Sequence, residues 1–83
     1  MRVNFRTIKI NMIINLTRDY FTLKHNASVG VMFLEDEEML DINCTYGMGG
    51  YGYSLEIGDV LEEDDPSVIL KLLNAKFKAQ DRG

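Results

Sequence analysis

The sequence contains one cysteine, one proline and no tryptophan, and its apolar residues form no long uninterrupted run. Because Cys44 has no second cysteine to pair with, an intrachain disulfide is excluded and a secreted fold held by disulfides is not expected. A secretory signal needs about 7–15 consecutive apolar residues, and a membrane span needs about 20. Polar residues interrupt the N-terminal segment before either length is reached. We therefore expect a cytoplasmic protein that does not contact a membrane.

A second absence is more specific, since residues 25–65 contain eleven acidic residues and no lysine or arginine. Residues 1–24 carry a formal charge of +4 and residues 66–83 carry +3, so the net charge is only -4. Phosphate contacts require clustered Lys and Arg, so direct binding of nucleic acid is not expected. Two interpretations of the acidic stretch stay open. Its residues are either solvated loops that the basic ends neutralise or a surface that recruits a basic partner.

The length of 83 residues limits the fold to one domain with a modest core. A chain of this size buries about two-thirds of the surface that its unfolded form exposes, which excludes two-domain architectures and the TIM barrel. The hydrophobic fraction of 46% is too high for a disordered chain. We expect a single domain over residues 1–83, with residues 1–6 as a loosely ordered arm and residues 81–83 as a tail.

Apolar residues alternate with polar ones through most of the chain, and this period of two predicts strands. The longest alternating run extends from Thr7 to Thr17. Shorter runs predict further strands at residues 21–24, 29–34, 39–46 and 51–57. The strand at 29–34 is apolar on both faces and is therefore predicted to be central. The glycine-rich segment 47–50 joins the last two strands as a hairpin.

The period changes after residue 65 and predicts a helix over residues 66–80. Asp65 is a good N-cap, and Pro66 suits the first helical position. Ile69, Leu73 and Phe77 then recur at helical spacing on one side. The predicted fold class is α+β: an antiparallel β-meander of about five strands, with one C-terminal amphipathic helix packed on one face.

No motif indicates a reaction. Residues 47–52 match the dinucleotide pattern G-x-G-x-x-G, but that motif needs a helix after it and a strand is expected here. His25 and Cys44 are placed two strands apart, about 10 Å, which is too far for a catalytic pair. The acidic runs lack the spacing of a calcium loop, and zinc needs four nitrogen or sulfur ligands. We expect no catalytic residue, no metal and no cofactor.

The leading hypothesis is a non-catalytic protein-binding module. It would be a small acidic inhibitor or regulator that docks on the basic, nucleic-acid-binding surface of a larger partner such as a nuclease, a toxin or a defence enzyme. Carboxylates can replace phosphates as counterions for Lys and Arg. Met48, in the glycine-rich hairpin, is expected to be an exposed contact. The residues assigned to this surface are Glu35, Asp36, Glu37, Glu38, Met48, Asp59, Glu62, Glu63 and Asp64.

The alternative hypothesis is a structural homo-oligomer subunit. One helix cannot cover five strands, so the far face of the predicted sheet would keep exposed apolar residues. A second copy of the chain would cover that face. The residues assigned to self-association are Ile13, Met32, Leu34 and Met39.

Overall fold

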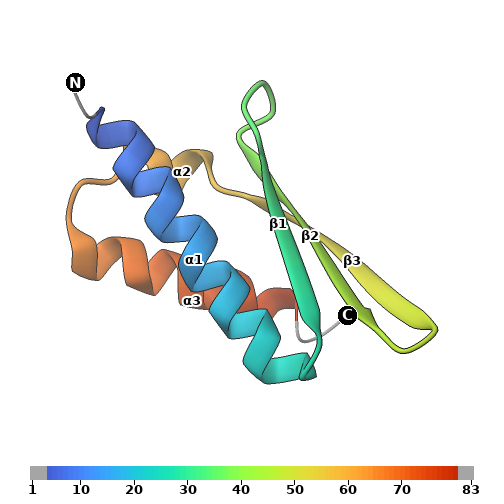
Figure 1. Cartoon of the computed structure of the whole chain (residues 1–83). Coiled ribbons are helices and arrows are strands. Elements are labelled where there is room, and N and C mark those ends of the chain that lie inside the picture. The colour runs from blue at the N-terminus through green and yellow to red at the C-terminus, as the bar shows by residue number, and fades with distance from the viewer. Residues whose placement is uncertain (1–3, 81–83) are drawn as a thin grey trace.

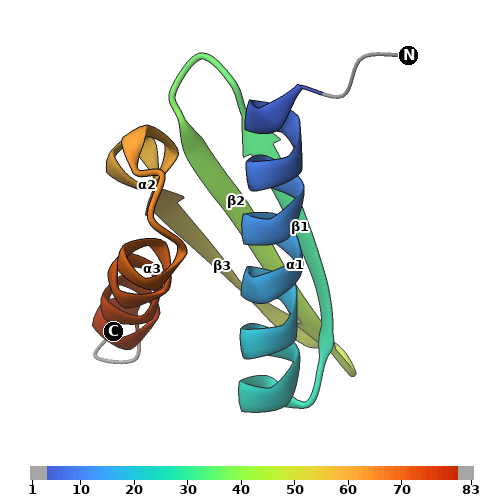
Figure 2. The ribbon, with the colours of Figure 1, turned by 90° about the vertical axis from the view of Figure 1, so that its left-hand side faces the viewer.

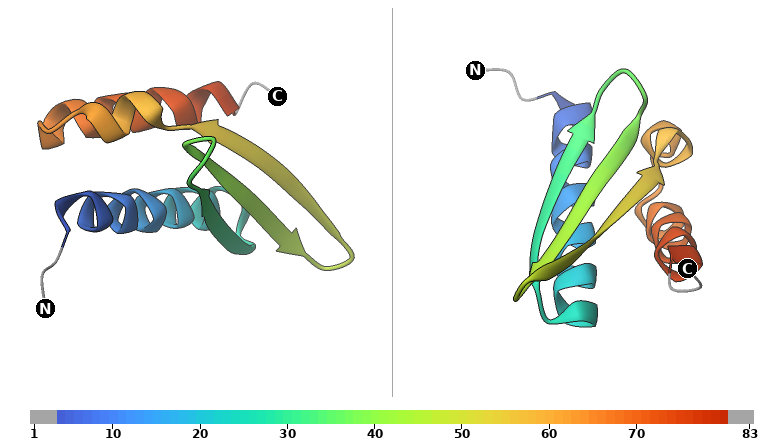
Figure 3. Two further views of the ribbon diagram at one scale, coloured as in Figure 1. Left: turned by 90° about the horizontal axis from the view of Figure 1, so that it is seen from above. Right: turned by 90° about the vertical axis from the view of Figure 1, so that its right-hand side faces the viewer.

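The structure, a computed structural model, describes residues 4–80 as one sheet and three helices (Figure 1). The elements in chain order are α1 (Phe5–His25), β1 (Ser28–Leu34), β2 (Met39–Tyr46), β3 (Gly49–Glu56), α2 (Gly58–Glu62) and α3 (Pro66–Gln80). The strands form one antiparallel sheet in the order β1-β2-β3. Helices α1 and α3 lie side by side on one face of this sheet (Figures 2 and 3). The fold is α+β, as predicted. However, the described residues form three strands where about five were predicted, and three helices where one was predicted.

The largest correction concerns α1, because the strands predicted at residues 7–17 and 21–24 are both parts of this helix. The segment has so many apolar residues that its sequence fits both the period of two of a strand and the period of a helix. Its buried positions follow the helical period: Ile13, Thr17 and Phe21 are four residues apart and lie against the sheet. The alternation of apolar residues was therefore a weaker signal than the spacing of four.

The ends of α1 are defined by two asparagines. The Asn4 side chain accepts a hydrogen bond from the backbone N–H of Arg6, as an N-cap does. Asn26 adopts the left-handed conformation, with φ of 49°, and its N–H donates to the carbonyl of Thr22. Residues 4–6 thus belong to the start of a helix, so the predicted arm over residues 1–6 is wrong for them. Residues 1–3 and the predicted tail 81–83 lie outside the described residues.

The remaining elements agree with the sequence patterns. The strand predicted at 39–46 is β2, and those at 29–34 and 51–57 correspond to β1 and β3. However, β1 is an edge strand and β2 is central, because the sheet has only three strands. The helix predicted at residues 66–80 is α3, and Asp65 caps it by accepting hydrogen bonds from the Ser67 backbone and hydroxyl. These bonds lower the pKa of the Asp65 carboxyl.

The core lies between the sheet and the helices. Helices α1 and α3 run in the same direction, since Lys9 meets Asp64 near their starts and the ring of Tyr20 stacks on Phe77 near their ends. Among residues 4–80, no helix is long and apolar enough to cross a membrane. The buried apolar residues are Ile13, Phe21, Leu40, Ile42, Cys44, Leu55, Ile57, Val60, Ile69, Leu73 and Phe77.

Ile13 is the one predicted self-association residue whose placement is wrong. Its side chain is fully buried on α1 and belongs to the core, because residue 13 is helical and faces the sheet. It is therefore not accessible to a second copy of the chain.

Candidate functional site

The acidic residues gather at the end of the sheet that carries the β1–β2 turn. Residues 35–38 form this turn, and all four are acidic and exposed. The antiparallel register pairs Met39 with Glu56, so the end of β3 lies beside the turn. The N–H of Ile57 donates to the carbonyl of Glu38 at 2.9 Å, which brings the start of α2 to the same place. We call Glu35, Asp36, Glu37, Glu38, Glu56 and Asp59 the acidic end.

A hollow of about 300 Å³ opens within the acidic end. It collects residues from four elements that are far apart in the sequence: the β1–β2 turn, β3, α2 and α3. Four of its six lining residues are carboxylates and one is a lysine. The lining residues are Glu37, Glu38, Glu56, Gly58, Asp59 and Lys76.

Two cations partly neutralise the acidic end. Arg6 lies 2.7 Å from a Glu35 oxygen and 4.0 Å from a Glu38 oxygen. The Lys76 ammonium lies 3.1 Å from Asp59. Within residues 4–80, no ion pair joins Asp36, Glu37 or Glu56 to a basic side chain. The six carboxylates of the acidic end therefore exceed the cations that contact them, and the excess charge faces solvent.

The backbone of the turn is unusual at Glu38, which has a φ of 49°. This left-handed conformation is unfavourable for a residue with a Cβ atom and is the conformation in which glycine is common. The Glu38 carboxylate lies over Gly58, where an added Cβ would be only 3.3 Å from its Oε1 atom. The backbone of Glu38 thus has a conformation that glycine would adopt more easily, and the Glu38 carboxylate lies beside the hollow.

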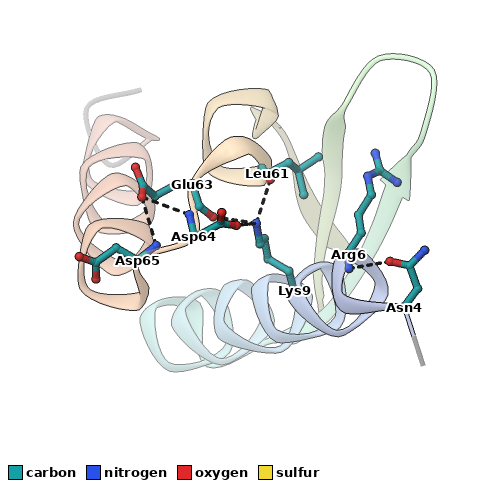
Figure 4. A network of polar contacts seen from close by, with 7 residues as sticks. All are labelled: Asn4, Arg6, Lys9, Leu61, Glu63, Asp64 and Asp65. Atoms are coloured by element: carbon teal, nitrogen blue, oxygen red, sulfur yellow. Dashed lines mark hydrogen bonds and ion pairs between the residues drawn. The ribbon is translucent and has the colours of Figure 1, made fainter. Parts of the chain in front are cut away.

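The three acidic residues that follow α2 have a different environment (Figure 4). The Lys9 ammonium donates to the carbonyls of Leu61 and Glu63, at 2.9 and 2.7 Å, and lies 3.3 Å from an Asp64 oxygen. The Glu63 carboxylate accepts hydrogen bonds from the N–H groups of Asp64 and Asp65. Glu63 and Asp64 therefore hold the connection between α2 and α3, although the Asp64 side chain, like that of Glu62, is exposed.

Met48 does not belong to the acidic end. It is fully exposed in the β2–β3 turn, which lies at the opposite end of β2 from the β1–β2 turn (Figure 1). An eight-residue strand separates the two turns by about 26 Å. One compact surface that includes both the acidic residues and Met48 is therefore not present.

The three other predicted self-association residues share the sheet face that carries no helix. Met32 pairs with Asp41, and Leu34 pairs with Met39, which in turn pairs with Glu56. Met32 is exposed, while Leu34 and Met39 are partly buried. Two acidic residues, Asp41 and Glu56, border them.

The end of the sheet with the β2–β3 turn carries aromatic residues. The Tyr53 hydroxyl and the His25 Nε2 atom are 3.1 Å apart, and the ring of Tyr53 stacks on Phe21. A hydrogen bond with Tyr51 raises the pKa of Tyr46 to about 12. His25 lies in the last turn of α1.

Cys44, the one cysteine of the chain, is buried in the core as a free thiol. Burial raises the pKa of the Cys44 thiol, which disfavours the reactive thiolate. Within residues 4–80, no group of three or more His, Cys, Asp or Glu side chains is arranged to hold a metal ion.

The sequence patterns missed three residues of this site. Glu56 and the two cations Arg6 and Lys76 lie far from residues 35–38 in the sequence, and only the strand register and helix packing bring them together.

A scan against protein-family models, a search of curated proteins and a search of solved structures each find no match to this chain.

Proposed function

We propose that this chain is a non-catalytic protein-binding module that docks through its acidic end on a basic surface of a larger protein. The partner is expected to use that surface for nucleic acid, as a nuclease, a toxin or a defence enzyme does. The observation that supports this most directly is the hollow of about 300 Å³ lined by four carboxylates.

The chemistry of the hollow suits a lysine or arginine side chain from a partner. Lys76 already places its ammonium 3.1 Å from Asp59 inside this lining, so a primary amine fits there. Within residues 4–80, Glu37 and Glu56 form no ion pair with a basic side chain. An incoming cation would therefore gain two carboxylates without first displacing a cation of this chain, and charge-assisted bonds of this kind are the stronger ones.

The conformation of Glu38 also supports the proposal. Residues held in unfavourable backbone conformations cluster at functional sites. Here the left-handed φ of Glu38 keeps its carboxylate beside the hollow. A glycine at this position would form the turn more easily but would supply no charge.

A surface of one charge sign mainly raises the association rate and selects the partner. Because the carboxylates of the acidic end are exposed, their attraction for a basic surface is screened within about 10 Å at 0.1 M salt. Binding should therefore weaken as the salt concentration rises, and nucleic acid should compete for the same surface of the partner.

The test compares two charge reversals of equal size. Glu37→Lys reverses a charge in the lining of the hollow, and Asp19→Lys reverses an exposed charge on α1 outside the acidic end. Wild-type protein and both variants are immobilised and incubated with extract of the source organism at about 50 and 300 mM salt. Captured proteins are identified by mass spectrometry and then challenged with duplex DNA and with RNA.

The proposal predicts a protein that wild type and Asp19→Lys capture at low salt, that Glu37→Lys does not capture, and that nucleic acid displaces. Capture that is equal for all three proteins, or that does not respond to salt and nucleic acid, would contradict it. Circular dichroism of each variant confirms that the fold is unchanged.

A further inference from the structure

The N-terminal half of α1 exposes an apolar ridge on its side away from the sheet. Phe5, Ile8 and Met12 are 65%, 51% and 38% exposed. Their spacing of three and four residues places them on one side of the helix. Leu70, which is 46% exposed, lies in the first half of the neighbouring helix α3. We call Phe5, Ile8, Met12 and Leu70 the helix-face patch.

A hollow of about 170 Å³ lies beside this ridge, between the first halves of α1 and α3. Phe5, Ile8 and Met12 form one wall, and Pro66 and Ile69 form the other. The two charged residues at its border are Lys9 and Asp64, which pair with each other. Because an apolar cavity of about 150 Å³ is large enough for benzene, this hollow can accept one large apolar side chain.

The size of the helix-face patch matches the apolar centre of a stable interface. A fully exposed large apolar side chain presents roughly 200 Å², so the four side chains expose about 400 Å² together. A specific interface buries about 800 Å² on each partner, of which about 55–65% is apolar. The patch alone would therefore supply most of the apolar area that a stable pair requires.

Two features indicate a second copy of this chain as the occupant. The ridge and the hollow lie next to each other on one surface, so each copy offers both the projecting side chain and the space for it, as a two-fold symmetric contact needs. Apart from Lys9, whose charge is paired with Asp64, the residues that flank the patch at helical spacing are also uncharged, so two copies would bring no unpaired like charges together there. These flanking residues are Asn4, Asn11, Asn15, Ser67 and Asn74.

We propose that two copies of the chain associate through the helix-face patch, with Phe5 or Met12 of each copy entering the hollow of the other. This contact leaves the acidic end outside the interface, because the patch lies on the helix side that faces away from the sheet. Both copies carry a net charge of -4, so added salt should strengthen the pair or leave it unchanged. Docking through the acidic end has the opposite salt dependence, so the two proposals fail independently.

Sedimentation velocity between about 1 and 500 µM tests the pair at a concentration range that spans moderate affinities. The expected result is a shift from 9.5 kDa to twice that mass as the concentration rises. Ile8→Glu places a charge in the centre of the patch and should leave only monomer at every concentration. The control is Met32→Glu, since Met32 is 61% exposed on the opposite sheet face and its replacement should not change the pair.

A melting curve shows whether Ile8→Glu is still folded. If it is not, Phe5→Ser gives the same readout with less risk to the core, because Phe5 is the most exposed residue of the patch. Glu37→Lys should remain paired. The proposal is overturned if wild type stays monomeric throughout, or if a folded Ile8→Glu or Phe5→Ser variant still pairs. It is also overturned if Met32→Glu separates the copies, which would place the contact on the sheet face.

Discussion

The two ends of the sheet are stabilised by different kinds of contact. At the acidic end, the turn is tied to α1 by an exposed ion pair between Arg6 and Glu35 and to the chain after β3 by one backbone hydrogen bond from Ile57. At the opposite end, aromatic rings pack in series, with ring centres 5.0 Å apart for Phe21 and Tyr53 and 5.5 Å apart for Tyr46 and Tyr51.

This difference separates the residues that the fold needs from those that are available for binding. An exposed ion pair contributes about 0–1 kcal/mol to stability, and many contribute nothing measurable. An aromatic pair adds about 0.5–1.5 kcal/mol to the larger gain from burying its rings. Substitutions at the acidic end should therefore cost little stability, whereas substitutions of the packed rings should cost much more.

The largest expected effect is at Phe21, which lies under the aromatic end. Its fully buried ring contacts those of Tyr20, Tyr53 and Phe77. Phe21→Ala should lower the free energy of unfolding by about 3–5 kcal/mol, because it leaves a cavity that its neighbours fill only in part. Urea denaturation followed by circular dichroism measures this. Tyr51→Ala, at a half-exposed ring, is the control and should lower the free energy of unfolding much less. Equal losses for the two variants would show that the buried ring of Phe21 does not contribute more to stability than the half-exposed ring of Tyr51.

A smaller effect is expected at Lys9, which is 7% exposed and joins α1 to the end of α2. Lys9→Met keeps the apolar stem and removes the ammonium, so the carbonyls of Leu61 and Glu63 lose their donor. The free energy of unfolding should fall by about 1–3 kcal/mol, the range for polar groups left without a partner. Hydrogen exchange should rise in α2 first. Lys71→Met, at an exposed position of α3, should have no such effect, and a similar loss there would refute the role of Lys9.

Lys9 also explains why the sequence did not reveal the first helix. A lysine among apolar residues looks like the polar face of a strand, and only its spacing of four from Ile13 places it on the buried side of a helix. The strands after residue 28 and the helix after Asp65 could be predicted, because each is short and is bounded by a clear turn or cap. The segment before residue 26 has two periods, and three-dimensional packing decides between them.

The candidate site was predictable only where it is local in the sequence. The acidic run at residues 35–38 is visible by reading, and it does form one exposed turn. The contribution of Glu56 depends on its pairing with Met39, and the neutralising cations come from helices at both ends of the chain. Asp64 could not be separated from the binding residues, because nothing in the sequence shows that Lys9 reaches it.

The two turns of the sheet provide the smallest and most specific prediction. The β2–β3 turn places a glycine, Gly47, in the left-handed region, with φ of 55°. The β1–β2 turn places Glu38 there instead, at φ of 49°. Glu38→Gly should therefore be more stable than Glu38→Ala by about 1 kcal/mol, since both lose the carboxylate and only alanine keeps the unfavourable contact of its Cβ atom. Equal stability of the two variants in urea denaturation would show that the backbone is not strained.

Binding to the captured partner separates conformation from charge at the same position. Both Glu38 variants remove the carboxylate beside the hollow, so both should bind the partner more weakly and to the same degree. If glycine restores stability but not binding, the left-handed turn is retained for the charge that it holds in place. If glycine binds as well as glutamate does, Glu38 has no part in docking, and the carboxylates of Glu37 and Glu56 must account for it.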